Sequence, residues 1–200
     1  HLFKFLKFTK KKKMNYSIEH IEYYIPEIVI DNDYLERESC ILKHFTENKI
    51  GIKERKIARS DETTSDMSAN SAKFLLEKHN INPDDIGLLI VCTQHPDYRL
   101  PTTACIVQDK IGLNKSTMAF DINLGCSGFV YSLPVAGNFI KNGKVKKALI
   151  IMADQYSKFL DYKDKNTASI FGDAAAAVLL SQCEDNYGVI DSNYGTDGSG

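Results

Sequence analysis

The sequence has few cysteines and no long apolar run. Its five cysteines form no CxxC pair and are odd in number, so we expect neither a disulfide framework nor a zinc site, and a reducing cytoplasm is the expected location. No run approaches the roughly 18 apolar residues of a membrane span. There is no internal repeat and no low-complexity linker. With 43% hydrophobic residues, a chain of 200 residues can form one sizeable core, or one half of a larger two-part protein.

Acidic residues are absent from the start of the chain. Residues 1–13 hold six lysines, whereas the rest of the chain holds 19 basic and 26 acidic residues, a net charge of −7. That balance excludes a nucleic-acid binder on charge grounds. In the leader the lysines follow the few apolar residues, the reverse of a signal peptide, which also argues against a membrane-touching arm. We therefore expect residues 1–13 to be a basic leader outside the fold and residues 14–200 to form the domain.

Strand and helix patterns alternate after the leader. Short apolar or alternating runs predict strands over residues 16–24, 86–92, 118–122, 148–153, 174–180 and 188–191. Caps, apolar periodicity and following glycines predict helices over residues 31–38, 42–49, 63–79, 102–111 and about 128–142. We expect Met67, Phe74 and Leu75 to face inward, and residues 53–56 to form a solvated charged edge. The alternation favours a layered α/β fold with a mixed sheet.

A cysteine stands where a strand turns into a helix. The apolar run 118–122 predicts a buried strand, and it is followed by Gly125, Cys126 and Gly128 and then by a helical pattern. A cysteine exposed at a helix N-terminus is favoured as the thiolate, and the arrangement is that of a nucleophile elbow with sulfur in place of the hydroxyl. Gly125 would permit the tight turn and Gly128 a close approach of a chain segment or substrate. The alternative is a small buried cysteine that packs like alanine; the context favours the nucleophile.

Four segments, taken in order along the chain, resemble a known family. They are residues 51–55 (GIKER), 100–105 (LPTTAC), 121–131 (DINLGCSGFVY) and 171–176 (FGDAAA). The third resembles the active-cysteine motif of the β-ketoacyl-acyl-carrier-protein synthase III family. The others resemble further signatures of that family at matching spacing, and together the motifs cover residues 14–200.

The resemblance implies a thiolase-like, five-layer αβαβα fold of two similar halves, of which this chain would be mainly the first. It implies that Cys126 carries an acyl group, and that an acyl thioester such as acyl-CoA is condensed with malonyl-acyl-carrier protein to start fatty-acid synthesis. The family's catalytic histidine and asparagine would lie beyond Gly200. No metal or bound cofactor is implied, and the expected assembly is a homodimer.

The resemblance also implies roles for three further residues. Lys49 and Lys158 stand where family arginines contact coenzyme A; lysine keeps the charge for a phosphate but not the planar stacking face. Ile50 replaces a threonine at the same site. Leu100 stands where a residue reaches into the neighbouring subunit's acyl pocket, which predicts that it limits acyl-chain length.

Several alternatives remain open at this point. One is another condensing enzyme of the same fold, such as a hydroxymethylglutaryl-CoA synthase or a polyketide-type synthase. Another is a non-catalytic partner subunit or an interaction-only fragment, against which the intact Gly-Cys-Ser-Gly turn argues. A local triad of Cys126, His95 and Asp97 is a further alternative, weaker than the reading of His95 as a surface loop residue.

Overall fold

The main body of the protein is a five-stranded mixed sheet with the order β1-β7-β6-β4-β5. The computed structural model describes residues 15–184 and 187–199, so the expected leader, residues 1–13, lies outside the described residues. The strands are β1 (Asn15–Tyr24), β4 (Ile86–Cys92), β5 (Met118–Ile122), β6 (Lys147–Gln155) and β7 (Asp173–Cys183). β4 is parallel to both β5 and β6, whereas β7 is antiparallel to β1 and β6. The expected mixed sheet is therefore confirmed.

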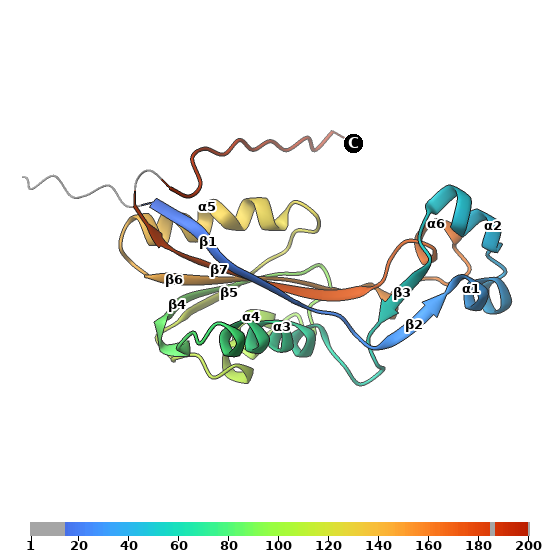
Figure 1. Cartoon of the computed structure of the whole chain (residues 1–200), viewed down its shortest axis with the longest axis horizontal. Helices are drawn as coiled ribbons and strands as arrows, with labels where there is room; N and C mark the ends of the chain where they lie inside the picture. Colours follow the sequence, from blue (N-terminus) through green and yellow to red (C-terminus); the bar gives the residue numbers. More distant parts are fainter. Residues whose placement is uncertain (1–14, 185–186, 200) are drawn as a thin grey trace, which may run out of the picture.

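Helices cover both faces of this sheet (Figure 1). α3 (Thr64–Lys78) and α4 (Thr103–Lys110) pack on one face and α5 (Gly128–Lys141) on the other. β4 lies between the two apolar clusters and is almost wholly buried, as its continuous apolar sequence predicts. The result is a helix–sheet–helix sandwich in which α5 covers one face and α3 and α4 cover the other.

The helix predicted over residues 63–79 forms, but the inward orientation expected for Phe74 is wrong. Thr63 caps α3 through a capping box with Asp66, and Met67 and Leu75 are fully buried. Phe74, expected to face inward, is 48% exposed and lies under the ammonium of Lys78, 5.2 Å from its ring centre. The buried stripe of α3 includes Leu75 and Leu76, and Phe74, about 100° before Leu75 around the helix, falls outside it.

A smaller lobe stands at one end of the sheet (Figure 1). Its own apolar cluster is formed by Ile30, Leu35, Ile41 and Ala168. The elements that surround this cluster are β2 (Ile28–Asp31), α1 (Asn32–Ser39), α2 (Lys43–Phe45), a π-helical turn (Thr46–Ile50), β3 (Glu54–Ile57) and α6 (Lys165–Ala168). The expected helices over residues 31–38 and 42–49 are both present here.

The solvated edge expected at residues 53–56 is wrong for Arg55. This side chain is 4% exposed in β3 and binds two acceptors that lie far away in the sequence. Its Nη1 donates to Asn32 Oδ1 at 2.6 Å, and its Nε donates to the carbonyl oxygen of Ser169 at 2.9 Å. Composition gave no sign of this because both acceptors come from other elements.

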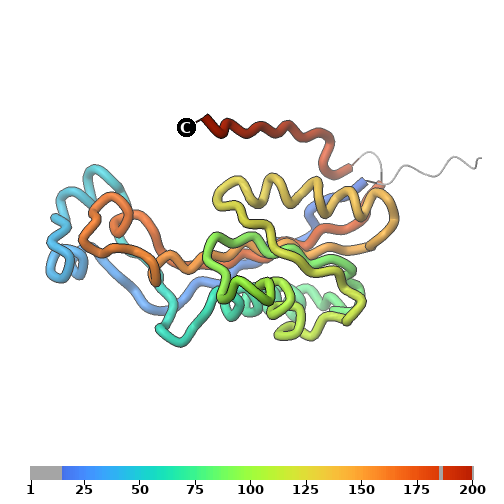
Figure 2. The backbone as a smooth tube through the Cα atoms, turned by 180° about the vertical axis from the view of Figure 1, so that it is seen from behind, coloured from blue at the N-terminus to red at the C-terminus, as the bar shows by residue number. Residues whose placement is uncertain are grey.

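Two strand expectations also need correction. β5 is an edge strand rather than a buried one, and Met118 at its start is 42% exposed. Residues 188–191 form no strand; a single backbone bond from Val189 N to Tyr16 O, 3.0 Å long, ties them to β1. Residues 187–199 instead run along α5 (Figure 2), where the Tyr131 hydroxyl donates to Gly195 O at 2.9 Å. No helix within the described ranges is long and apolar enough to cross a membrane.

Candidate active site

Three parallel strands end side by side, and chemically active residues follow each of them. In the order β6, β4, β5, the registers pair Cys92, the last residue of β4, with Ile122, the last residue of β5, and with Met152, three residues before the end of β6. Ligands of α/β sheets bind at such edges. The residues that follow these ends are therefore the candidates for a site, and Cys126 is among them.

Cys126 lies in the exposed turn between β5 and α5. The turn is closed by a bond from Gly128 N to Gly125 O of 2.8 Å, and α5 begins at Gly128. The structure thus places this cysteine where the sequence predicts it, and the alternative of a buried, alanine-like cysteine is wrong. None of the described residues accepts a hydrogen bond from its backbone N–H.

The two glycines of the turn lie close to side chains of β4 and of the loop that follows it. The tight turn expected at Gly125 is present, since its carbonyl accepts from Gly128 N, although the backbone of Gly125 is not left-handed. A Cβ added there would lie 2.6 Å from Oε1 of Gln94. At Gly128 an added Cβ would lie 3.2 Å from the Cβ of Cys92. The close approach expected at Gly128 is therefore confirmed, and the approaching group is the chain's own strand β4.

Two buried hydrogen bonds through Ser132 hold the first turn of α5 against β4. The Ser132 hydroxyl donates to Gly128 O at 2.7 Å, and its oxygen lies 2.8 Å from Sγ of Cys92. The Cys92 thiol is then the donor to Ser132. Burial raises the pKa of the Cys92 thiol above its ordinary value. Cys92 is therefore a structural cysteine, held in the thiol form.

The carboxylate of Asp154 organises the loop that follows β4. Its Oδ1 accepts from Gln94 N at 2.7 Å and from the Thr93 hydroxyl at 3.1 Å, and it lies 3.3 Å from Nδ1 of His95. The pairing of His95 with Asp97 considered from the sequence is wrong. Asp97 Oδ1 instead accepts from the backbone N–H of Ser65 at 3.1 Å, at the start of α3.

Tyr156, the first residue after β6, contacts this loop. Its hydroxyl donates to Oε1 of Gln94 at 2.6 Å, and its ring stacks on Phe171 with centroids 4.5 Å apart. Burial raises the pKa of Tyr156, and negative charge on Asp154 and Cys126 raises it further. Our sequence reasoning missed Gln94, Asp154 and Tyr156, although their position at the carboxyl ends of predicted parallel strands was an available signal.

The other residues expected at the site are more dispersed. Lys158 is exposed at the end of β6, and its ammonium donates to Glu62 O at 2.8 Å. Lys49 is exposed on the π-helical turn of the small lobe. Leu100 is 82% exposed in the loop before α4. None of the three contacts Cys126 through a hydrogen bond or ion pair in the described part of the chain, so their roles remain predictions.

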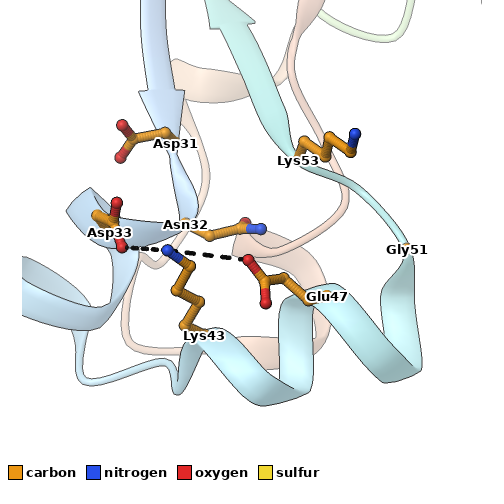
Figure 3. Close-up of a pocket in the computed structure, with 7 residues that line it drawn as sticks. All are labelled: Asp31, Asn32, Asp33, Lys43, Glu47, Gly51 and Lys53. Atoms are coloured by element: carbon orange, nitrogen blue, oxygen red, sulfur yellow. Dashed lines mark hydrogen bonds and ion pairs between the residues drawn. The ribbon is translucent and has the colours of Figure 1, made fainter.

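A pocket of about 340 Å³ in the small lobe contains none of these residues (Figure 3). It is lined by Asp31, Asn32, Asp33, Lys43, Glu47, Gly51 and Lys53. Lys43 Nζ binds Asp33 Oδ1 at 2.8 Å and lies 3.9 Å from Glu47 Oε1, and the hydrogen bond to Asp33 raises the pKa of Lys43. This lysine therefore already has carboxylate partners. The described residues also hold no cluster of three metal-ligating side chains.

Comparisons with known proteins agree with this geometry. The family model described as 3-oxoacyl-[acyl-carrier-protein (ACP)] synthase III matches residues 120–198, which include the cysteine turn. The β-ketoacyl-[acyl-carrier-protein] synthase III of Caldanaerobacter subterraneus subsp. tengcongensis is 40% identical over 88% of this chain and 53% of its own length. That of Sulfurovum sp. is 41% identical over 96% of this chain and 56% of its own length.

Solved structures give the same result. The 3-oxoacyl-[acyl-carrier-protein] synthase III of Aquifex aeolicus superposes with a TM-score of 0.80 at 39% identity, over 85% of this chain and 55% of that one. A priming β-ketosynthase from the R1128 polyketide pathway reaches 0.81 at 21% identity, which shows the shared fold alone. The resemblance and the layered thiolase-like fold are thereby confirmed. The chain spans about half the length of the curated relatives it matches.

Proposed function

We propose that this chain, which is homologous to β-ketoacyl-acyl-carrier-protein synthase III enzymes over most of its length, is the acyl-carrying half of such a condensing enzyme, the N-terminal one. The reaction would join an acyl thioester to malonyl-acyl-carrier protein and give a 3-oxoacyl-carrier protein, which starts fatty-acid synthesis. The observation that supports this most is the exposed Cys126 in the turn between β5 and α5, at the edge where parallel strands end.

The first half-reaction uses groups of this chain. The thiolate of Cys126 attacks the carbonyl carbon of the acyl thioester, the carbon–sulfur bond to the donor breaks, and the donor leaves as a thiolate that takes a proton from water. In the tetrahedral intermediate the oxygen carries the charge. The backbone N–H of Cys126, which no described residue engages, is suited to donate to that oxygen.

The second half-reaction needs groups outside this chain. Loss of carbon dioxide from the malonyl group leaves a carbanion equivalent that attacks the acyl-cysteine and releases the thiolate. The histidine and asparagine that the resemblance places beyond Gly200 would stabilise that carbanion. His95 is a weak substitute, because it is paired with Asp154 and its ring packs against Phe159, with centroids 4.8 Å apart.

Donor recognition and assembly follow from the resemblance. Lys49 and Lys158 would bind the phosphates of coenzyme A, which for Lys158 requires its ammonium to leave the carbonyl of Glu62. Leu100, exposed on the loop before α4, would enter the acyl pocket of a second subunit in a homodimer. A cytoplasmic location remains a prediction from the unpaired cysteines.

The test is a condensation assay on the protein at its natural full length. With acyl-CoA and malonyl-acyl-carrier protein, mass spectrometry of the carrier protein should show the 3-oxoacyl product. Cys126→Ser should abolish it, because a hydroxyl at neutral pH is a far weaker nucleophile than a thiolate. Cys105→Ser, which removes another exposed cysteine, is the matched control and should leave the rate unchanged. Product formation by Cys126→Ser at the normal rate would refute the proposal.

A further inference from the structure

The carboxamide of Gln94 lies against the residue that precedes the nucleophile. A Cβ added to Gly125 would lie 2.6 Å from Oε1 and 3.3 Å from Nε2 of Gln94, so the amide occupies the space that a side chain at position 125 would take. The backbone of Gln94 is fixed as well, since its N–H donates to Asp154 Oδ1 at 2.7 Å. The amide therefore lies against Gly125, the residue directly before Cys126.

Tyr156 decides which end of the amide is free. Its hydroxyl donates to Oε1 at 2.6 Å, and it remains protonated at neutral pH because burial raises its pKa. The ring is held by stacking on Phe171 and by an edge contact with His95, with centroids 4.5 and 4.3 Å apart. Oε1 is thereby engaged, while no residue in the described ranges accepts from Nε2.

The free N–H groups of Gln94 have a consequence for the acyl group. Gln94 is exposed in the structure, so water satisfies them. An acyl chain placed on Cys126 would displace that water. A plain alkyl chain would then leave the donors unpaired, whereas a chain with an oxygen close to the carbonyl would accept from them. Sites built to hydrogen-bond a substrate group discriminate against analogues that lack it.

We propose that Gln94 is a specificity-determining residue, oriented by Tyr156, that selects acyl thioesters with a hydroxyl or oxo oxygen near the carbonyl over unsubstituted alkyl thioesters. This inference rests on the proposed function, because it concerns the group that Cys126 accepts. Gln94 is the residue that would touch the substrate, and Tyr156 is a positioning residue that acts through it.

The experiment compares two donors of equal chain length, butyryl-CoA and 3-hydroxybutyryl-CoA, on the full-length protein. The rate of acyl addition to Cys126 is followed by mass spectrometry for each donor. One net hydrogen bond corresponds to a preference of about tenfold for the hydroxylated donor. Gln94→Leu and Gln94→Met, which both lack the N–H donors, should lower the ratio to near one, and Tyr156→Phe should lower it in part. Gln182→Leu, at the opposite end of the sheet in β7, is the matched control and should keep the full ratio.

The possible results distinguish failure of the role of Gln94 from failure of the proposed function. Equal rates for the two donors in the unmodified protein, or a preference that survives in folded Gln94→Leu and Gln94→Met, would overturn the role of Gln94 and leave the proposed function intact. Thermal melts establish that the variants are folded. Absence of an acyl adduct on Cys126 with either donor would overturn the proposed function and this inference with it.

Discussion

Replacing Arg55 by methionine should destabilise the protein strongly. The guanidinium is 4% exposed and donates to the side chain of Asn32 in α1 and, from both Nε and Nη2, to the carbonyl of Ser169 after α6. It thus joins β3 to two other elements of the small lobe. Methionine fills a similar volume but donates nothing, so both acceptors would be left buried and unsatisfied.

The size of the effect follows from those two acceptors. An unsatisfied buried polar group costs about 1–3 kcal/mol. Relief of the desolvated charge offsets part of this cost, since burial lowers the pKa of Arg55 and so disfavours its charged form. The expected loss in the free energy of unfolding is about 2–4 kcal/mol.

The assay is urea unfolding followed by circular dichroism, on the full-length protein. Lys53→Met is the matched control, because Lys53 is exposed and close in sequence; we expect a change within about 0.5 kcal/mol. Arg55→Lys should recover little, since a single ammonium cannot reproduce the planar fork. Equal stability of Arg55→Met and Lys53→Met would refute the argument that these buried hydrogen bonds hold the lobe together.

Three further substitutions test other parts of the account. Gly137→Ala places a Cβ 2.2 Å from the ring of buried Tyr16. We expect the variant to be less stable, because overpacking costs about 1–3 kcal/mol and the gain in helix propensity is only about 1 kcal/mol. A higher urea midpoint than in the unmodified protein would contradict this. The pKa of Glu22 lies below its ordinary value of 4.5, because Lys78 and then His79 hydrogen-bond its carboxylate. The ionised Glu22 therefore stabilises the folded protein above pH 4.5, and this contribution is lost as the pH falls through the lowered pKa. Glu22→Gln should therefore weaken the loss of stability at acid pH. If the free energy of unfolding fell with pH as steeply in the variant as in the unmodified protein, Glu22 would not be the cause of that loss. Leu100→Gly should lengthen the accepted acyl chain; an unaltered profile with competing short and medium donors would count against a pocket role.

Much of the fold could be predicted from local patterns. β4 was predicted because an apolar run seven residues long suits a strand buried on both faces, and α5 because its apolar positions recur with helical spacing. The edge position of β5 could not be predicted, because strand order depends on contacts between distant segments. The burial of Arg55 was missed for the same reason, since its acceptors are separated from it by 23 and 114 residues.

The site was predicted only as far as its local turn. Cys126 could be identified because strand, glycine, cysteine and helix are contiguous in the sequence. Gln94 and Tyr156 are 62 residues apart and meet only because β4 and β6 are parallel neighbours. The pairing of His95 with Asp97 was wrong because it relied on their closeness in the sequence. In the fold, Asp154 near the end of β6 lies beside the imidazole of His95 instead.

The most direct test of the central claim is to locate the acyl group. Full-length protein is incubated with acyl-CoA in the absence of malonyl-acyl-carrier protein, so that the covalent intermediate accumulates, and is then digested and mapped by mass spectrometry. We predict that the acyl mass is found on the peptide that contains Cys126. An acyl group on the exposed Cys40 or Cys105, with Cys126 unmodified, would contradict the account.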